Sequence, residues 1–267
     1  MYTAPFRYLR PKTLREAETL FRESADARYI AGGQTLIPTM KQRLAAPSDL
    51  IDIARIPSLD FIRREGNTLL IGAGTRHADV AASPEVRSSI AGLAVLAGQI
   101  GDPAVRHKGT LGGSIANNDP AADYPAGVLA LSATVKTTRR AIAAGDFFTG
   151  MFETVLQPGE IVTEVAFPVP RRSGYAKFPN PASRYAMVGV FVAVLDNGVR
   201  VAVTGAAPCV FRASEMEAAL ARDFTPESLS RIAISSDGLN SDLFGSAEYR
   251  AHLVGVMAKR AVAAAML

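Results

Sequence analysis

The sequence predicts an α+β protein, in which strands and helices follow one another without the regular strand–helix repeat of a doubly wound parallel sheet. Three observations lead to this class. Short runs of β-branched residues indicate strands, apolar residues at helical spacing indicate amphipathic helices, and Gly/Asn pairs mark hairpins. The clearest hairpin signal is Asn197-Gly198, between strands expected over 188–195 and 199–204.

The first part of the chain begins with a helix at Thr13. Thr13 and Glu16 have the spacing of a capping box, ahead of an apolar stripe. A strand then runs into Gly32-Gly33, and a second helix is expected to start behind Thr35. The elements expected here are a helix over 13–22, a strand over 28–31, a helix over 35–44 and a strand over 50–53.

The middle of the chain mixes both element types. We expect a hairpin of 61–64 with 68–71, short helices over 76–100, a loop over 101–120, a helix over 121–131 and strands over 134–138 and 161–167. Residues 168–174, PVPRRSG, are the best linker candidate because the composition changes there. Behind the later hairpin we expect helices over 213–221, 226–235 and 247–264.

Composition excludes several classes of protein. Among the 267 residues, Lys and Arg exceed Asp and Glu by only 29 − 25 = 4 and are scattered, so nucleic acid is a poor candidate partner. The single cysteine, Cys209, excludes an internal disulfide and any zinc or iron–sulfur site held by several cysteines of this chain. We expect no metal site, no membrane-spanning segment and, with Arg7 and Arg10 where a signal peptide would be apolar, a cytoplasmic location.

Two glycine-rich segments could bind phosphate. In AGGQT (31–35), glycines after a strand would let the backbone approach a ligand, although a pair of glycines there also makes an ordinary turn. In TLGGSIANNDPAAD (110–123), hydroxyls, amides and carboxylates surround Gly112-Gly113; a solvated connection is the alternative. Together the two segments suit a dinucleotide, whose pyrophosphate needs donors from more than one side.

Other motifs are weaker. IGAGTRH (71–77) follows a strand as a dinucleotide-binding turn would, but His77 replaces the third glycine and no acidic residue stands about twenty positions on. Ser114 lacks the G-x-S-x-G context of a serine hydrolase. A free-standing nicotinamide dehydrogenase and a non-catalytic nucleotide-binding module therefore remain alternatives, and a parallel sheet opening at Gly72 would favour the first.

Taken together, AGGQT and TLGG resemble the two flavin loops of the FAD-binding medium subunits of the molybdenum hydroxylases, the xanthine and carbon monoxide dehydrogenase family. The resemblance continues through 71–80, 117–126, 158–168 and 245–261. It implies a p-cresol methylhydroxylase-type FAD fold over 1–173, with α+β subdomains of about 1–56 and 57–173. A small C-terminal α+β domain over 174–267, with an antiparallel sheet and helices, would follow.

The resemblance also implies the site, in which the flavin carries the chemistry and no side chain is catalytic. The implied FAD-binding residues are Ala31, Gly32, Gly33, Gln34, Thr35, Leu36, Thr110, Leu111, Gly112, Gly113, Ser114, Asn118, Asp123, Ile161, Val162, Lys177 and Tyr185. Both loops would hold the pyrophosphate through backbone N–H groups, and Tyr185 would cover the isoalloxazine. Gln34 and Thr35 stand where the family commonly has His and Ser.

Partners are implied as well. A large subunit would hold the molybdenum cofactor and oxidise the substrate, a small subunit would hold two [2Fe–2S] clusters, and non-covalent FAD on this chain would pass electrons to NAD, a quinone or another acceptor. A dimer of such heterotrimers is expected. The lone Cys209 argues against the benzoyl-CoA reductase branch, which adds an iron–sulfur cluster to this subunit.

Overall fold

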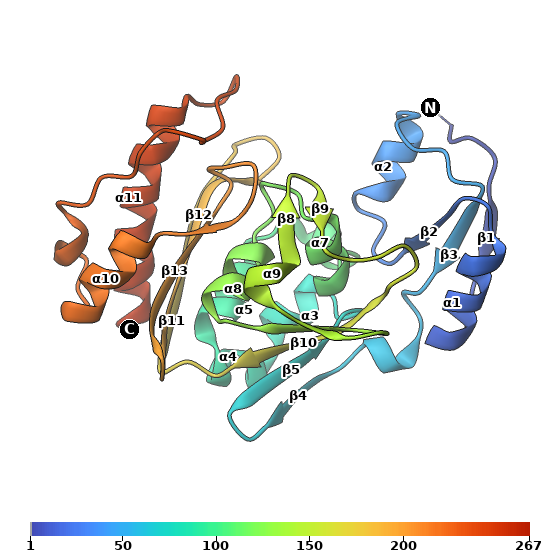
Figure 1. Ribbon diagram of the computed structural model, residues 1–267, viewed down its shortest axis with the longest axis horizontal. Coiled ribbons are helices and arrows are strands. Elements are labelled where there is room, and N and C mark those ends of the chain that lie inside the picture. Colours follow the sequence, from blue (N-terminus) through green and yellow to red (C-terminus); the bar gives the residue numbers. More distant parts are fainter. Residues whose placement is uncertain (1) are drawn as a thin grey trace.

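The computed structural model describes residues 2–267, in which three main sheets are arranged in a row, with the N-terminal sheet at one end and the C-terminal sheet at the other (Figure 1), beside a separate two-stranded pair. Two of the sheets are antiparallel and the first is parallel. Helices pack between and beside them, so the predicted α+β class is confirmed.

The N-terminal part is a three-stranded parallel sheet in the order β1-β3-β2. Its elements are β1 (Arg7–Leu9), α1 (Leu14–Glu23), β2 (Ala27–Ile30), α2 (Leu36–Lys41) and β3 (Asp49–Asp52). The predicted cap is present, because the hydroxyl of Thr13 accepts a hydrogen bond from the N–H of Glu16. The sequence did not reveal β1, which has only three residues and becomes a strand through pairing with β3.

The central part is built on a five-stranded antiparallel sheet in the order β4-β5-β10-β6-β7. Its strands are β4 (Ile62–Glu65), β5 (Thr68–Gly72), β6 (Thr134–Thr137), β7 (Ala141–Ala143) and β10 (Val162–Pro168), with the small β8 (Phe148–Gly150) and β9 (Glu153–Thr154) pairing separately. Its helices are α3 (His77–Ala82), α4 (Pro84–Ser89), α5 (Ala91–Gly98), α6 (Pro103–Arg106), α7 (Leu111–Asn117), α8 (Tyr124–Ala130) and α9 (Ala144–Phe147). The predicted β4–β5 hairpin is confirmed.

The expectation of a loop over 101–120 is wrong, since this segment contains α6 and α7. Asp102 and Thr110 accept hydrogen bonds from N–H groups three residues on and start the two helices. Gly112 is tolerated inside α7 because the helix lies directly on β5's extension: a Cβ on Gly112 would fall 2.5 Å from that of Ala73. Packing therefore outweighs the low helix propensity of glycine.

The C-terminal sheet has the order β11-β12-β13-β14. Its elements are β11 (Arg172–Pro179), β12 (Ala186–Leu195), β13 (Gly198–Thr204), β14 (Phe211–Arg212), α10 (Ser214–Arg222) and α11 (Ala247–Ala265). The β12–β13 hairpin and the last helix are confirmed. The helix expected over 226–235 is wrong, since only Glu227–Leu229 form a 3-10 turn, and the expected linker is shorter because β11 already begins at Arg172.

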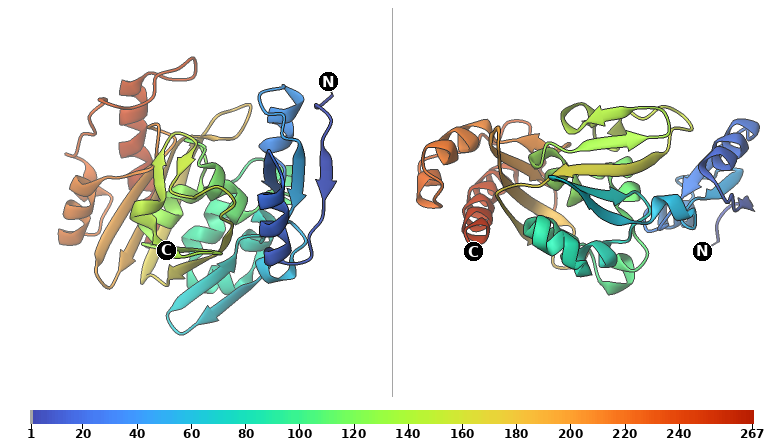
Figure 2. Two further views of the ribbon diagram at one scale, coloured as in Figure 1. Left: turned by 45° about the vertical axis from the view of Figure 1, so that its right-hand side comes forward. Right: turned by 90° about the horizontal axis from the view of Figure 1, so that it is seen from below.

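Both faces of this sheet are covered. Along β12, Val190 and Val192 belong to the core shared with α11, whereas Phe191 and Ala193 belong to the larger core that includes the central helices. Figure 2 shows α11 on the outer side of the sheet, away from the central helices. Burial on two faces explains why β12 is an almost unbroken apolar run.

Candidate functional site

The first glycine-rich segment forms an open turn between β2 and α2. Gly33 has a φ of +69°, a conformation that side-chain-bearing residues rarely adopt. Among the residues that the structure describes, the five backbone N–H groups of 32–36 donate no hydrogen bond. A run of free N–H groups next to a helix start is an arrangement that binds anions such as phosphate.

The second segment differs from what the sequence implied. Thr110 caps α7, and the N–H groups of 111–114 all donate within the protein, to Thr75, Ala73 and Thr110. These four groups are therefore not free to bind a pyrophosphate in the way implied for them. The segment contributes Gly112, Gly113 and Ser114 to the cavity wall, and the two glycines have no side chain there.

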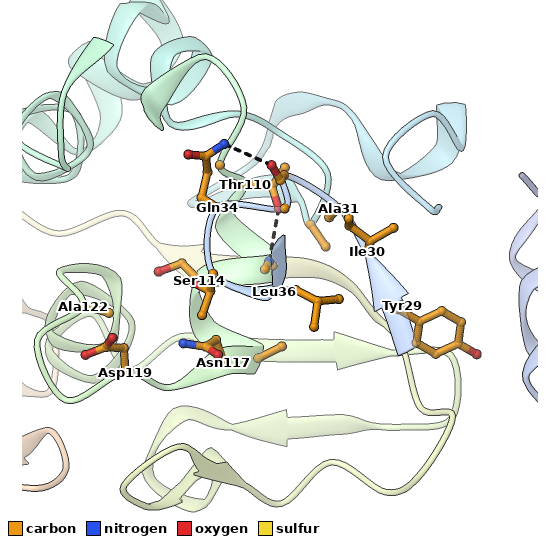
Figure 3. A pocket seen from close by; sticks show the side chains of 18 of the residues that line it. Tyr29, Ile30, Ala31, Gln34, Leu36, Thr110, Ser114, Asn117, Asp119 and Ala122 are labelled. Carbon is orange, nitrogen blue, oxygen red and sulfur yellow. Dashed lines mark hydrogen bonds between the residues drawn. The ribbon is translucent and has the colours of Figure 1, made fainter. Parts of the chain in front are cut away.

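The two segments touch through their backbones. A Cβ on Gly32 would fall 2.3 Å from the carbonyl oxygen of Lys108 and 2.6 Å from the Cα of Gly109. Any larger residue at position 32 would push the segments apart. Figure 3 shows the site from close by, with Tyr29 and Asp119 toward opposite sides of the view.

Between the segments lies a cavity of about 530 Å³, a size typical of small-molecule sites. Its walls come from the N-terminal sheet, from α7 and the segment that follows it, and from the start of β10. Fourteen of the seventeen implied residues line it: Ala31, Gly32, Gly33, Gln34, Thr35, Leu36, Thr110, Gly112, Gly113, Ser114, Asp123, Ile161, Val162 and Tyr185.

Comparison with known proteins gives the cavity its context. Residues 4–170 match the family model "FAD binding domain in molybdopterin dehydrogenase", and 173–265 match "CO dehydrogenase flavoprotein C-terminal domain". The chain belongs to the FAD-binding medium subunits of the molybdenum hydroxylases. It is accordingly an FAD-binding component of an oxidoreductase.

Individual relatives are similar to this flavin subunit over nearly its whole length. The carbon monoxide dehydrogenase medium chain of Hydrogenophaga pseudoflava is 36% identical over 97% of this chain and 96% of its own. The nicotine 6-hydroxylase medium subunit of Paenarthrobacter nicotinovorans is 34% identical over 96% and 95%. Among solved structures, reconstituted CO dehydrogenase from Oligotropha carboxidovorans superposes with a TM-score of 0.91 at 33% identity, covering 99% of each chain.

The cavity of this flavin subunit fits FAD on its own features. Five free N–H groups suit the pyrophosphate, and Gly32 and Gly112 stand where backbones meet too closely for a side chain. Apolar walls such as Ile161 and Val162 suit a flat aromatic ring. Among residues 2–267 no group of three or more His, Cys, Asp and Glu side chains could hold a metal ion, and no helix is long and apolar enough to cross a membrane.

Three implied residues do not line the cavity. Leu111, the first residue of α7, is fully buried in the core. Asn118 has a left-handed backbone, and its amide donates to the carbonyls of Gly150 and Glu153, so it holds the β8–β9 turn. Lys177, with a side chain only 2% exposed, donates to Asp123 and to the carbonyl of Gln99. Its contact is with the carboxylate that lines the cavity.

Two acidic side chains mark the end of the cavity near Tyr185. Burial raises the pKa of Asp119, and burial also raises the pKa of Asp123 against the opposing charge of Lys177. Burial, Asp119 and Asp123 together raise the pKa of Tyr185. Tyr185 is therefore a neutral phenol at pH 7, half-exposed at the cavity wall, where its ring can cover a bound aromatic group.

The implied set also missed part of the wall. The additional lining residues include Ala73, Gly74, His77, Gly109, Asn117 and Asp119. Three of them belong to IGAGTRH, which was considered as a nicotinamide-binding turn and as part of the family resemblance, but none of whose residues was named as FAD-binding. That reading fails because β5, which ends at Gly72, pairs antiparallel with β4 and β10. Burial, together with the charge of Arg106, lowers the pKa of His77 to about 4, so its imidazole is neutral at pH 7.

Proposed function

We propose that this flavin subunit takes electrons from a partner's [2Fe–2S] centre and passes them to an external acceptor. When bound, FAD supplies the redox chemistry, accepting electrons and handing them on. The observation that carries the proposal is the cavity itself, where free backbone N–H groups at one side suit the pyrophosphate and an acid–tyrosine wall at the other suits the isoalloxazine of a flavin dinucleotide.

The chain's own residues then have separate tasks. The N–H groups of 32–36 bind the pyrophosphate, and Gly32 and Gly112 let the segments that form the cavity wall pack directly against Gly109 and Ala73. Ile161 and Val162 exclude water from one side of the isoalloxazine, and Tyr185 covers it. Asp123 accepts a hydrogen bond from the cofactor.

The partners are proposed from the relatives. Proteins named as medium chains or subunits match this chain over nearly their full length, which suggests that a large molybdopterin-binding subunit and a small [2Fe–2S] subunit complete the enzyme. A dimer of heterotrimers and a cytoplasmic location belong to the same proposal. The acceptor stays open among NAD, quinone and other oxidants.

Purification of the lone chain and of the coexpressed complex tests the proposal. The lone chain should be yellow and oxidise no purine, aldehyde or carbon monoxide, and acid precipitation should release all of the colour, because FAD is held without a covalent bond. In the complex, the flavin should become reduced when the large subunit's substrate is added. A lone chain that reduces its flavin with an organic substrate would instead be a self-contained flavin oxidoreductase, and a colourless one would favour the non-catalytic nucleotide-binding module.

A further inference from the structure

The carboxylate of Asp123 is held in an unusual way for its position in the chain. Asp123 is the residue in front of α8, where an aspartate side chain normally accepts hydrogen bonds from the first N–H groups of the helix. Here it makes no such bond. Instead its Oδ1 accepts a hydrogen bond from the hydroxyl of Tyr175 at 2.5 Å and another from the Nζ of Lys177 at 2.8 Å.

Both donors come from one face of β11. Tyr175 and Lys177 are two residues apart, so their side chains point to the same side of the sheet, toward the central helices. Both side chains are almost fully buried, at 3% exposure for Tyr175 and 2% for the side chain of Lys177. Lys177 is fixed in turn by the carbonyl oxygen of Gln99 at 2.8 Å.

A glycine on the neighbouring strand makes room for the tyrosine. Gly189 lies within β12, where nearly all other residues are apolar and buried, and it pairs with Lys177 across the sheet. A Cβ on Gly189 would fall 2.5 Å from the hydroxyl oxygen of Tyr175. Glycine weakens a strand interior, so its presence here is explained by the hydroxyl that crosses over it.

The second carboxylate oxygen is left for the cavity. Asp123 lines the cavity, and its Oδ2 accepts no hydrogen bond from any residue between 2 and 267. Burial, together with the negative charge of Asp123, raises the pKa of Tyr175 well above its ordinary value. The hydroxyl therefore keeps its proton and donates a hydrogen bond to Asp123. Two donors on one oxygen therefore fix the plane of the carboxylate and the direction of the other oxygen.

We infer that Tyr175 is a positioning residue. Together with Lys177 and the space left by Gly189, it holds Asp123 so that the Oδ2 of Asp123 points at the N–H or O–H group of bound FAD from which Oδ2 accepts a hydrogen bond. The inference rests on the proposed place of Asp123 beside FAD. Tyr175 itself does not line the cavity and acts only through Asp123.

A double-mutant cycle on the full chain tests this, with FAD binding followed by flavin fluorescence. Tyr175→Phe should raise the FAD dissociation constant roughly tenfold, the scale of one hydrogen bond to a charged group. In an Asp123→Asn background the same change should have little effect. Tyr124→Phe is the matched control, because Tyr124 is equally buried and its hydroxyl has no partner among the described residues.

A second readout separates positioning from simple packing. The midpoint potential of the bound FAD should move in Tyr175→Phe and stay unchanged in Tyr124→Phe. Gly189→Ala should destabilise the protein by crowding the hydroxyl, and adding Tyr175→Phe should recover part of the lost stability, since it removes the 2.5 Å contact while Cγ2 of Thr204 stays at 3.0 Å.

The outcomes separate two failures. If Asp123→Asn leaves FAD binding unchanged, the proposed place of Asp123 is wrong. If Asp123→Asn weakens binding but Tyr175→Phe behaves like Tyr124→Phe, or keeps its full effect in the Asp123→Asn background, the positioning role of Tyr175 is overturned while the flavin site stands.

Discussion

At the scale of single residues, the proposed flavin site depends on backbone groups more than on side chains. Gly33 provides a left-handed turn, Gly32 allows two segments to touch, and the N–H groups of 32–36 stay free. The proposal therefore allows Gln34 and Thr35 to differ from the His and Ser that the resemblance implies for these positions. Their side chains can change while the backbone donors remain.

Gly33→Val should abolish FAD binding in a protein that remains folded. A β-branched residue strongly disfavours a φ of +69°, so the turn and its N–H groups would be rearranged. Flavin content after purification, with circular dichroism as the folding check, measures the effect. Gly145→Val is the control, since that glycine has ordinary φ and open space around its Cβ. Full flavin content in Gly33→Val would mean that the segment is an ordinary turn.

Tyr185→Ala should weaken FAD binding about fivefold. Contact between aromatic faces contributes roughly 1 kcal/mol, and the substitution replaces this contact by solvent. The effect should be modest because Tyr185 is already 45% exposed. Titration with FAD measures it, and Tyr2→Ala, at a highly exposed tyrosine outside the cavity wall, should bind FAD like the wild type. Unchanged affinity in Tyr185→Ala would remove this tyrosine from the site.

At the scale of secondary structure, the site is formed where several helices and one strand begin, in different parts of the chain. The turn before α2, the first turn of α7, the residue before α8 and the start of β10 all meet at one cavity. The last of these is held by Glu160, which binds Arg140, Thr137 and the N–H of Gln157. This cluster fixes the segment that presents Ile161 to the cavity.

Glu160 should make stability depend on acid pH. Burial opposes its ionisation, but the hydrogen bonds from Arg140, Gln157 and Thr137 prevail and lower the pKa of the carboxyl to about 2. Because the folded pKa lies below the unfolded one, this stabilisation is present at neutral pH and is lost as pH falls from about 4.5 toward 2. Urea unfolding should show Glu160→Gln to be less stable than wild type at pH 7, with a smaller difference at pH 3. An equal difference at both pH values would contradict this.

Gly255→Ala should stabilise the protein by about 0.5–1 kcal/mol. This glycine lies inside α11, where a Cβ would meet no atom within 4 Å, and alanine has the higher helix propensity. Thermal unfolding measures the gain. Gly174→Ala on β11 should do the opposite, since its Cβ would fall 2.1 Å from the carbonyl oxygen of Ala261 in α11. A loss of stability in Gly255→Ala would contradict this prediction, because it would mean that the added methyl group meets an atom where the structure shows open space.

At the scale of the whole molecule, the cavity joins the N-terminal sheet to the central part. Its walls alternate between the two, and their backbones meet directly at Gly32 and Gly109. A ligand in this cavity contacts both parts at once, so it should oppose their separation during unfolding. The C-terminal part contributes as well, through Tyr185 in the connection between β11 and β12 and through Tyr175 and Lys177 of β11, which hold Asp123.

FAD should therefore raise the unfolding temperature of the lone chain in a concentration-dependent way. At a hundredfold excess over its dissociation constant, a ligand of the folded state adds roughly 2.7 kcal/mol. Riboflavin is the control, because it lacks the pyrophosphate that the N–H groups of 32–36 would bind. Equal stabilisation by riboflavin and FAD, at the same concentration, would show that those groups contribute nothing.

The sequence alone determined the α+β class, most long elements and the two glycine-rich segments that line the cavity. Local signals suffice for these: the cap at Thr13, the Asn197-Gly198 turn and glycines behind a strand act on their neighbours in the chain. Only the tertiary structure decided which N–H groups stay free, since those of 111–114 are used by Ala73, Thr75 and Thr110. It also decided the role of Lys177, because Asp123 lies 54 positions away and no local pattern encodes their contact.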